Sequence, residues 1–188
     1  MRKVFLIFIL IFLCHICGAP SIDFRLEMLK FKSLSEYIDK KYHESEFSRF
    51  INDLGYRESG NNWLCINRIG CFGEWQFDES TLYYLGYRKI TLKKFKANPD
   101  IFPRELQLKA LKILINENLI LLMDYEHFIG DSIKDVVITK SGMIAASHLG
   151  GAGSLKKFLN SKGRINKKDI LGTSIYDYLK KFNYYDLE

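Results

Sequence analysis

The residue with the clearest chemical potential is Glu58, which is followed directly by Ser59 and Gly60. Apolar residues precede it at steps of three and four, which predicts a helix that ends close to Glu58. The negative end of a helix dipole favours a protonated carboxyl over an ionised one. A protonated carboxyl is what a general acid for glycosidic cleavage requires, because the leaving sugar oxygen must receive a proton.

Three short blocks of sequence stand in order along the chain. They are ESG with Trp63 at 58–63, GEWQ at 73–76, and AASHLGGAG at 145–153. Taken together, the blocks resemble those of the lysozyme-like superfamily, in particular the lytic transglycosylases related to soluble lytic murein transglycosylase and to goose-type lysozyme. The resemblance extends from Phe47 to Phe182. It implies a mainly α, lysozyme-like single domain, α+β with minimal β, that carries a substrate groove.

The resemblance also implies a reaction and a catalytic residue. Glu58 would cleave the β-1,4 bond between N-acetylmuramic acid and N-acetylglucosamine in peptidoglycan and form a 1,6-anhydro sugar. One carboxyl suffices in this chemistry because the N-acetyl group of the substrate assists from within, so no cofactor is expected.

Other functions stay open at this point. If water enters the site, the same residues give a hydrolytic, lysozyme-type muramidase. A noncatalytic peptidoglycan-binding module would keep the groove without using Glu58, and a chitin-directed glycosidase is a weaker alternative.

The resemblance assigns substrate binding to residues within the three blocks, which are Ser59, Trp63, Trp75, Gln76 and His148. The family has Asn where this chain has His148, and a His can also form a hydrogen bond with a sugar or an acetamido group. An aromatic ring of Trp63 or Trp75 can stack on a pyranose.

Each of these residues also has a purely structural interpretation. Gln76 could be a turn residue that bonds the backbone, the two tryptophans could belong to the core, and His148 could be a packed histidine that closes the glycine turn. Glu58 could be a solvated residue paired with Arg57 or Arg49.

A second carboxylate, Glu74, stands in the middle block where the family has an apolar residue. We expect Glu74 to be a surface or hydrogen-bonding residue and not a second catalytic acid.

Cys65 and Cys71 are the cysteines outside the N-terminal segment. In an oxidising compartment they could form a disulfide worth roughly 2 kcal/mol, provided the chain turns around Asn67 and Gly70. Two separate buried thiols are the alternative. No metal site is expected, because the histidines of the mature chain are scattered at no ligand spacing.

Five helices are predicted to position these residues. Their ranges are 33–41 after a Ser33 cap, 47–54, 103–122 with Pro103 in its first turn, a stretch from Thr139 through the glycine cluster to Leu159, and 173–182. The helix over 103–122 is nearly continuous in apolar residues, so we expect it to be central. Strand signals are weak and limited to 136–138 and 75–77.

The N-terminus predicts export. Met1-Arg2-Lys3 precedes an apolar run from Val4 to Cys17, which is shorter than the roughly 20 residues that span a bilayer and fits a secretory signal. We expect residues 1–19 to be a signal peptide or lipoprotein signal, 20–46 an N-terminal helical segment, and 47–188 the lysozyme-like domain. A soluble exported form, a lipid-anchored form and an uncleaved signal anchor are all open, and each places the protein in the periplasm, at the cell envelope or outside the cell.

The composition fits one globular domain. The chain has 188 residues, of which 47% are hydrophobic and 27% charged, with 3 Pro, which argues against a disordered chain. The net charge of +6 falls to +4 without residues 1–19, since that segment holds Arg2 and Lys3 and no acid. This surplus suits an anionic surface but is too small and too dispersed to indicate nucleic acid. The expected partner is the peptidoglycan glycan strand, contact with a membrane is expected only through an anchor, and a monomer is the simplest state.

Overall fold

The computed structural model describes residues 21–187, and the predicted export signal at 1–19 lies outside this range. The chain divides into two compact units, Met1–Glu44 and Ser45–Glu188. No helix in the described part of the chain is both long enough and apolar enough to cross a membrane.

The first helix, α2 (Ser21–Ser59), runs from one unit into the other and ends one residue after Glu58. Two separate helices over 33–41 and 47–54 were expected, and the structure corrects this to a single helix of 39 residues. The physical reason is that no Gly or Pro interrupts the sequence between Ser21 and Leu54. Within the first unit Leu34, Tyr37 and Ile38 are exposed, whereas Phe50 and Leu54 in the second unit are fully buried.

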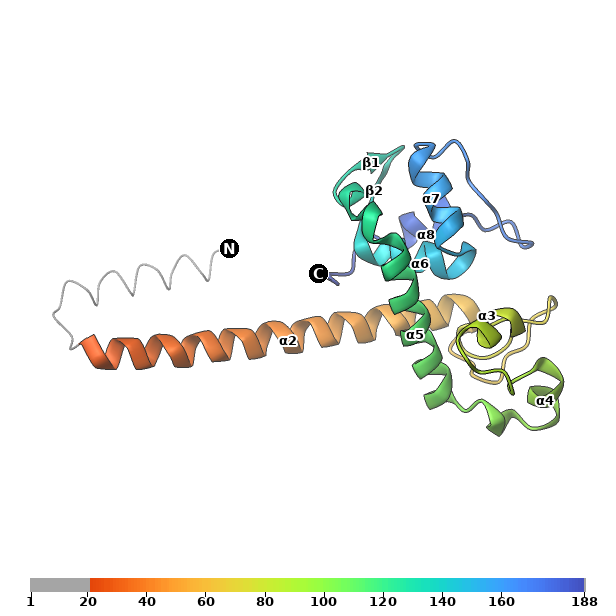
Figure 1. Ribbon diagram of the computed structural model, residues 1–188, viewed down its shortest axis with the longest axis horizontal. Coiled ribbons are helices and arrows are strands. Elements are labelled where there is room, and N and C mark those ends of the chain that lie inside the picture. The colour runs from red at the N-terminus through yellow and green to blue at the C-terminus, as the bar shows by residue number, and fades with distance from the viewer. Residues whose placement is uncertain (1–20, 188) are drawn as a thin grey trace. The chain divides into compact units, whose positions relative to one another are not determined.

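The second unit is mainly helical, as predicted. After the end of α2 it contains α3 (Glu79–Tyr84), α4 (Leu92–Ala97), η1 (Pro99–Ile101), α5 (Arg104–Leu122), η2 (Met123–Phe128), β1 (Ser132–Ile133), β2 (Val136–Val137), α6 (Lys140–Gly150), α7 (Ala152–Asn160) and α8 (Ile175–Lys181). The two strands form one antiparallel hairpin, in which Ser132 pairs with Val137 and Ile133 with Val136. Figure 1 shows this order of elements.

Three helices start where they were predicted, whereas Ser33, the expected cap, lies inside α2. Pro103 precedes α5, and the Thr139 side chain caps α6 by accepting a hydrogen bond from the Gly142 amide. Ser174 caps α8 in a reciprocal capping box with Asp177. The predicted helix through the glycine cluster is interrupted at Gly151, whose φ of 77° ends α6 before α7 begins.

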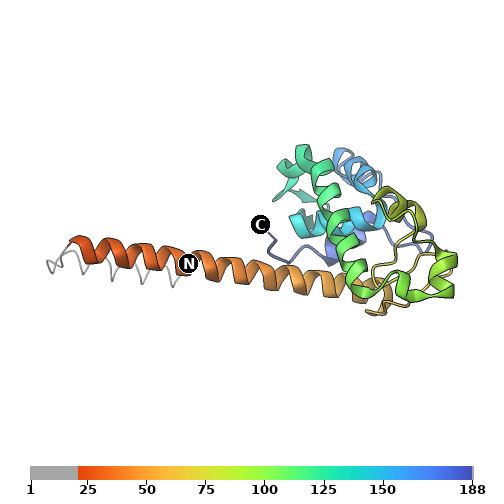
Figure 2. The same cartoon turned by 60° about the horizontal axis from the view of Figure 1, so that its bottom comes forward.

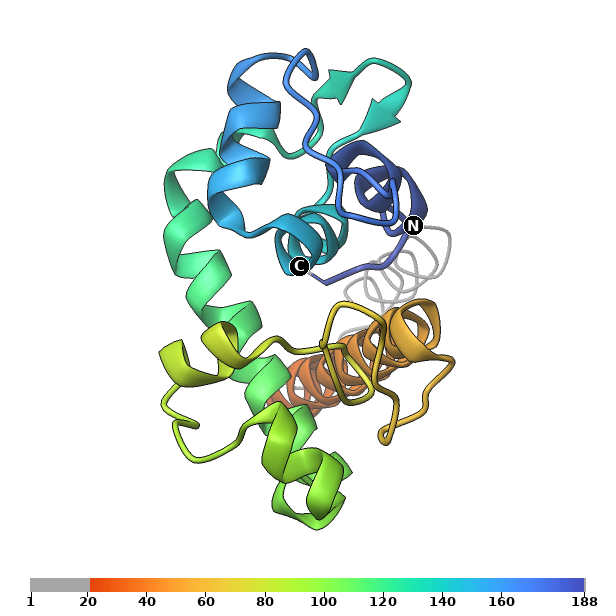
Figure 3. The same cartoon turned by 90° about the vertical axis from the view of Figure 1, so that its right-hand side faces the viewer.

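The most deeply buried helix among the described residues is α6, whereas α5, which was expected to be central, runs between the two groups of elements in this unit (Figures 2 and 3). Residues 141–147 are all buried, and α6 packs against α5, α7 and α8. In contrast, α5 buries one face and exposes Ile113, Ile120 and Leu121 on the other. Figures 2 and 3 show that α5 joins two groups of elements within this unit: the end of α2 with α3 and α4 lies at one end, and the hairpin with α6, α7 and α8 at the other.

Candidate functional site

Glu58 lies in the last turn of α2, as predicted. The helix ends because Gly60 takes a φ of 68°, and the Gly60 and Asn61 amides donate to the carbonyls of Tyr56 and Gly55. The Glu58 side chain is 15% exposed, so it is partly shielded from water while still open to a ligand.

Tyr178 of α8 holds the Glu58 carboxyl. Its hydroxyl donates to Glu58 Oε1 over 2.5 Å, and the tyrosine is almost fully buried. Burial and the neighbouring Glu58 charge both raise the pKa of Tyr178, so its hydroxyl stays protonated and remains a donor. Sequence reasoning missed this residue. The available signal was a hydroxyl on the apolar face of the last helix, which needs a partner once it is buried.

His148 approaches the same carboxyl oxygen from α6. Its Nε2 is 4.0 Å from Glu58 Oε1 and 3.0 Å from the carbonyl oxygen of Trp75. A carbonyl can only accept, so Nε2 carries a hydrogen, while the buried Nδ1 has no hydrogen-bond partner. The side chain is 7% exposed, which fits the packed-histidine interpretation, yet the packing places it beside Glu58.

The two oxygens of Glu58 therefore have different surroundings. Oε1 accepts from Tyr178 and lies nearest His148, whereas no donor in residues 21–187 forms a hydrogen bond with Oε2. A carboxyl that is fixed through one oxygen can exchange its proton through the other.

Gln76 lies in a tight turn that is closed by hydrogen bonds between Phe72 and Phe77. Its backbone has a φ of 50°, and its Nε2 donates to the Gly73 carbonyl over 2.7 Å. The amide nitrogen is thus engaged by the backbone, as the structural interpretation expected. Its oxygen, Oε1, is buried and has no hydrogen-bond partner among the described residues, so the predicted sugar contact by Gln76 would require this side chain to turn outward.

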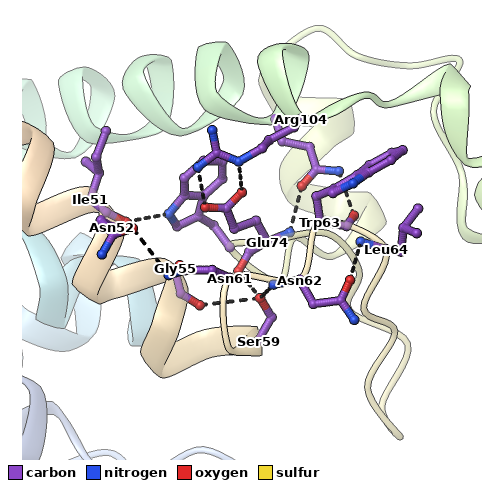
Figure 4. Close-up of polar contacts among 12 residues, drawn as sticks. Ile51, Asn52, Gly55, Ser59, Asn61, Asn62, Trp63, Leu64, Glu74 and Arg104 are labelled. Carbon is purple, nitrogen blue, oxygen red and sulfur yellow. Dashed lines mark hydrogen bonds and ion pairs between the residues drawn. The ribbon is translucent and has the colours of Figure 1, made fainter.

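Ser59 connects the end of α2 to this turn. Its hydroxyl donates to the Glu74 carbonyl over 2.8 Å and accepts from the Asn62 amide over 3.0 Å, as Figure 4 shows. With its single proton committed, Ser59 positions the helix end that carries Glu58.

The two tryptophans have different places. Trp75 is 1% exposed and its Nε1 donates to the Ile51 carbonyl, so its ring has no free face on which a sugar could stack. The predicted substrate contact by Trp75 is therefore corrected to a core position. Trp63 is half-buried, and its carbonyl accepts from Gln107 of α5; its ring points away from Glu74 in Figure 4 and remains a candidate for stacking.

Glu74 is fully buried, and the structure corrects the expectation of a surface position. Both of its oxygens accept from the Arg104 guanidinium, at 2.6 and 2.8 Å, and its backbone amide donates to Gln107 Oε1. Figure 4 shows this bidentate pair. Because both oxygens are occupied by a cation, Glu74 is a hydrogen-bonding residue and is poorly suited to be a second acid.

The predicted disulfide is absent, since Cys65 and Cys71 both carry free thiols. The chain around the two cysteines forms a short antiparallel pair in which Ile66 lies opposite Phe72 and Cys65 lies opposite Gly73. Cys71 is therefore a diagonal neighbour of Cys65 across this pair. Diagonal neighbours are about 7–8 Å apart, beyond the reach of an unstrained disulfide. Burial raises the pKa of the Cys71 thiol, which lowers its reactivity.

The structure thus places His148 of the third block beside Glu58 of the first, and His148 also contacts the backbone of the middle block at Trp75. Residues 21–187 contain no group of three metal-ligating side chains. Comparison with known proteins finds no matching family model, no matching curated protein and no matching solved structure.

Proposed function

We propose that this protein is an exported enzyme with a lysozyme-like fold that cleaves the glycan strand of peptidoglycan as a lytic transglycosylase. Glu58 is the single catalytic acid and base. The observation that carries the proposal is the Glu58 carboxyl itself, which is held through Oε1 by Tyr178 and accepts no hydrogen bond at Oε2 from the described part of the chain. The approach of His148 to this carboxyl, and the backbone contacts of the 73–76 block with Ser59 and His148, add support.

The chemistry needs one proton-transfer group at two moments. Glu58 Oε2 first gives its proton to the oxygen between N-acetylmuramic acid and N-acetylglucosamine, and the bond from that oxygen to C1 breaks. The acetamido oxygen of the substrate stabilises the positive charge at C1. Glu58, now a carboxylate, then takes the proton of the muramyl 6-hydroxyl while O6 attacks C1, which closes the 1,6-anhydro ring and restores the acid.

The three sequence blocks favour this one-carboxyl route over a two-carboxylate route. The other carboxylate in these blocks is Glu74, and both of its oxygens are bound by Arg104. A retaining or inverting glycosidase would need a second free carboxyl across the bond. The same Glu58 would also serve a hydrolase if water reached C1.

The test is mass spectrometry of the fragments released from purified peptidoglycan by the wild-type protein and by Glu58→Gln. The amide is nearly isosteric and cannot transfer the proton, so we expect the variant to keep its fold and lose activity. Glu117→Gln is the matched control, since Glu117 also accepts from a tyrosine, Tyr84, at an exposed position.

Fragments one water lighter than hydrolysis products, absent with Glu58→Gln, would support the lytic transglycosylase. Fragments of full mass would make the protein a muramidase that uses the same acid. Full activity of Glu58→Gln would end the assignment of Glu58, and no fragments from the wild type would favour the binding-module alternative.

A further inference from the structure

Two adjacent aliphatic residues, Ile170 and Leu171, lie at the tip of the loop between α7 and α8. Ile170 is 73% exposed, the highest value among the large apolar side chains that the structure describes, and Leu171 is 57% exposed. Figure 1 draws this loop in blue, where it protrudes from the second unit. Water in contact with such an aliphatic pair is unfavourable, so a surface that covers the pair would be bound favourably.

The turn that carries this pair is closed by its own hydrogen bonds. Asp169 Oδ1 accepts from the Leu171 and Thr173 amides over 2.9 and 2.8 Å. The Asp169 amide donates to the Thr173 carbonyl, and the Gly172 amide donates to the Asp169 carbonyl. Backbone groups that are already bonded lose little when water leaves, so this tip can enter an apolar layer at low cost.

The same loop is strongly basic. Residues 161–174 contain one acid, Asp169, and four cations, which are Lys162, Arg164, Lys167 and Lys168. All four cationic residues are exposed, and no carboxylate in residues 21–187 forms an ion pair with any of them. The Asp169 carboxylate is engaged by the turn, and Asp177, which feels the charge of Lys168, is engaged in the capping box of α8. The loop therefore presents positive charge to an anionic partner.

A second loop of the same character lies beside the first. It follows α2, and its exposed Ile69 lines the same pocket as Ile170, which brings the two loops together. Residues 59–73 contain no acid and one cation, the exposed Arg68, and Leu64 is also exposed. Figure 1 shows the tips of both loops on the same side of the second unit. The exposed aliphatic residues thus belong to one basic and apolar surface made by two loops.

We propose that these two loops form a peripheral membrane contact, in which Ile170 and Leu171 enter the interfacial layer of a bilayer and the cations meet anionic lipid headgroups. Charge and polarity together select this partner, because anionic headgroups lie directly above acyl chains. A soluble polyanion or a glycan strand would use the cations and leave the aliphatic pair in water. The contact goes beyond the proposed function and depends neither on that function nor on an N-terminal anchor.

The first experiment places a reporter at the tip. The full chain with Leu171→Trp is mixed with vesicles of equimolar phosphatidylcholine and phosphatidylglycerol whose brominated acyl chains quench tryptophan inside the bilayer. We expect a loss of emission that the wild type, with Trp63 and Trp75 alone, does not show. Leu121→Trp is the matched control, since Ile120 and Leu121 are also an adjacent, exposed aliphatic pair, on α5, and it should show no added quenching. The readout is local, so attachment through another part of the chain does not produce it.

The second experiment tests the charges in the Leu171→Trp background. Lys167→Gln/Lys168→Gln should raise the lipid concentration for half-maximal quenching roughly tenfold or more, because two charges leave the anionic surface. Added salt should weaken the quenching in the same direction. The matched control is Lys40→Gln/Lys41→Gln, an adjacent and exposed lysine pair in the first unit, which should leave this concentration unchanged.

Several outcomes would overturn the membrane contact. Equal quenching of Leu171→Trp and Leu121→Trp would remove the tip from the bilayer. Undiminished quenching with phosphatidylcholine alone, or in the Lys167→Gln/Lys168→Gln variant, would show that the cations have no part. If Leu171→Trp is not quenched and Ile170→Asn/Leu171→Asn no longer sediments with purified peptidoglycan, the loops bind the glycan strand instead. None of these outcomes bears on Glu58, which the fragment analysis tests separately.

Discussion

At the residue scale, the proposed chemistry depends on how one carboxyl is held. Tyr178 and His148 come from different helices and meet at Oε1 of Glu58. Neither side chain can be moved without repacking, because both are more than nine-tenths buried. The Glu58 side chain is therefore preorganised, which is the condition for proton transfer with little reorganisation.

Removal of the Tyr178 hydroxyl should weaken this arrangement. A hydrogen bond to a charged group contributes roughly 1.5–3 kcal/mol, so we expect Tyr178→Phe to lower kcat roughly 10- to 150-fold with little change in KM. Steady-state kinetics on peptidoglycan strands measures this. Tyr176→Phe is the control, because Tyr176 donates to the exposed Asp135 instead. Equal activity of Tyr178→Phe and wild type would show that Tyr178 has no part in positioning Glu58.

The raised pKa of Tyr178 predicts a specific alkaline behaviour. Burial and the Glu58 charge favour the protonated phenol in the folded state, so the folded pKa lies above the unfolded value of about 10. Its contribution to stability is complete below about pH 10 and is lost as the pH rises through the folded pKa. Tyrosinate absorbance should thus show Tyr178 ionising only together with alkaline unfolding. An ordinary titration step near pH 10 that disappears in Tyr178→Phe would contradict this.

The sequence predicted part of this candidate site and missed part of it for physical reasons. Glu58, Gln76 and His148 are candidates because short motifs mark them in the linear chain. Tyr178 could not, since its role depends on where α8 packs, and no motif surrounds it. Trp75 was misassigned because an aromatic residue beside a site residue can face either the groove or the core, and only packing decides between them.

At the element scale, α5 organises the turn behind the site. Gln107 is fully buried on α5, and its side chain accepts from the Glu74 amide and donates to the carbonyls of Trp63 and Phe102. The turn itself needs Gly73, because a Cβ there would lie 2.6 Å from Gln107 Oε1 and its φ is 88°. These contacts fix the turn over residues 73–76. The Glu74 carbonyl of this turn accepts from the Ser59 hydroxyl and so holds the end of α2.

The Glu74–Arg104 ion pair is the second link between α5 and the turn. Arg104→Met would leave the fully buried Glu74 carboxylate without its cation, which costs about 3 kcal/mol, at the lower end of such losses because the Arg104 side chain is 51% exposed. Glu74→Gln/Arg104→Met should recover much of this loss, since the buried charge is then removed. Urea unfolding of the single and double variants measures the difference. A double variant as unstable as Arg104→Met alone would refute this explanation.

Helix starts were easier to predict than helix continuity. Thr139 and Ser174 act through local hydrogen bonds, so their capping roles are visible in the sequence. The length of α2 could not be predicted in the same way, because the polar residues between its two apolar stretches are compatible with either a loop or a continuous helix. The deep burial of α6 was not predicted, since small residues such as Ala145 and Ala146 pack deeply without a strong apolar signal.

At the scale of the whole molecule, the core belongs to the second unit. Every buried apolar residue among the side chains that the structure describes lies between Phe50 and Tyr185. The ring of Phe50, near the start of this unit in the sequence, makes edge-on contacts with Phe182 and Tyr185, near its end. The proposed catalytic residue Glu58 and its neighbours His148 and Tyr178 all lie within the same range.

A chain that begins at Ser45 should therefore fold by itself and keep the proposed activity. The first unit contributes no buried apolar residue among its described side chains, so we expect the free energy of unfolding to change by less than about 1 kcal/mol and Tm by less than about 4 °C. Circular dichroism melting measures the stability of this chain, and the peptidoglycan assay measures its activity. A chain that begins at Asn52 is the matched control: it lacks Phe50 and the Ile51 carbonyl that accepts from Trp75, and it should not fold. If the chain from Ser45 also failed to fold, residues 21–44 would have to stabilise the core, and the boundary of the catalytic unit would lie further towards the N-terminus.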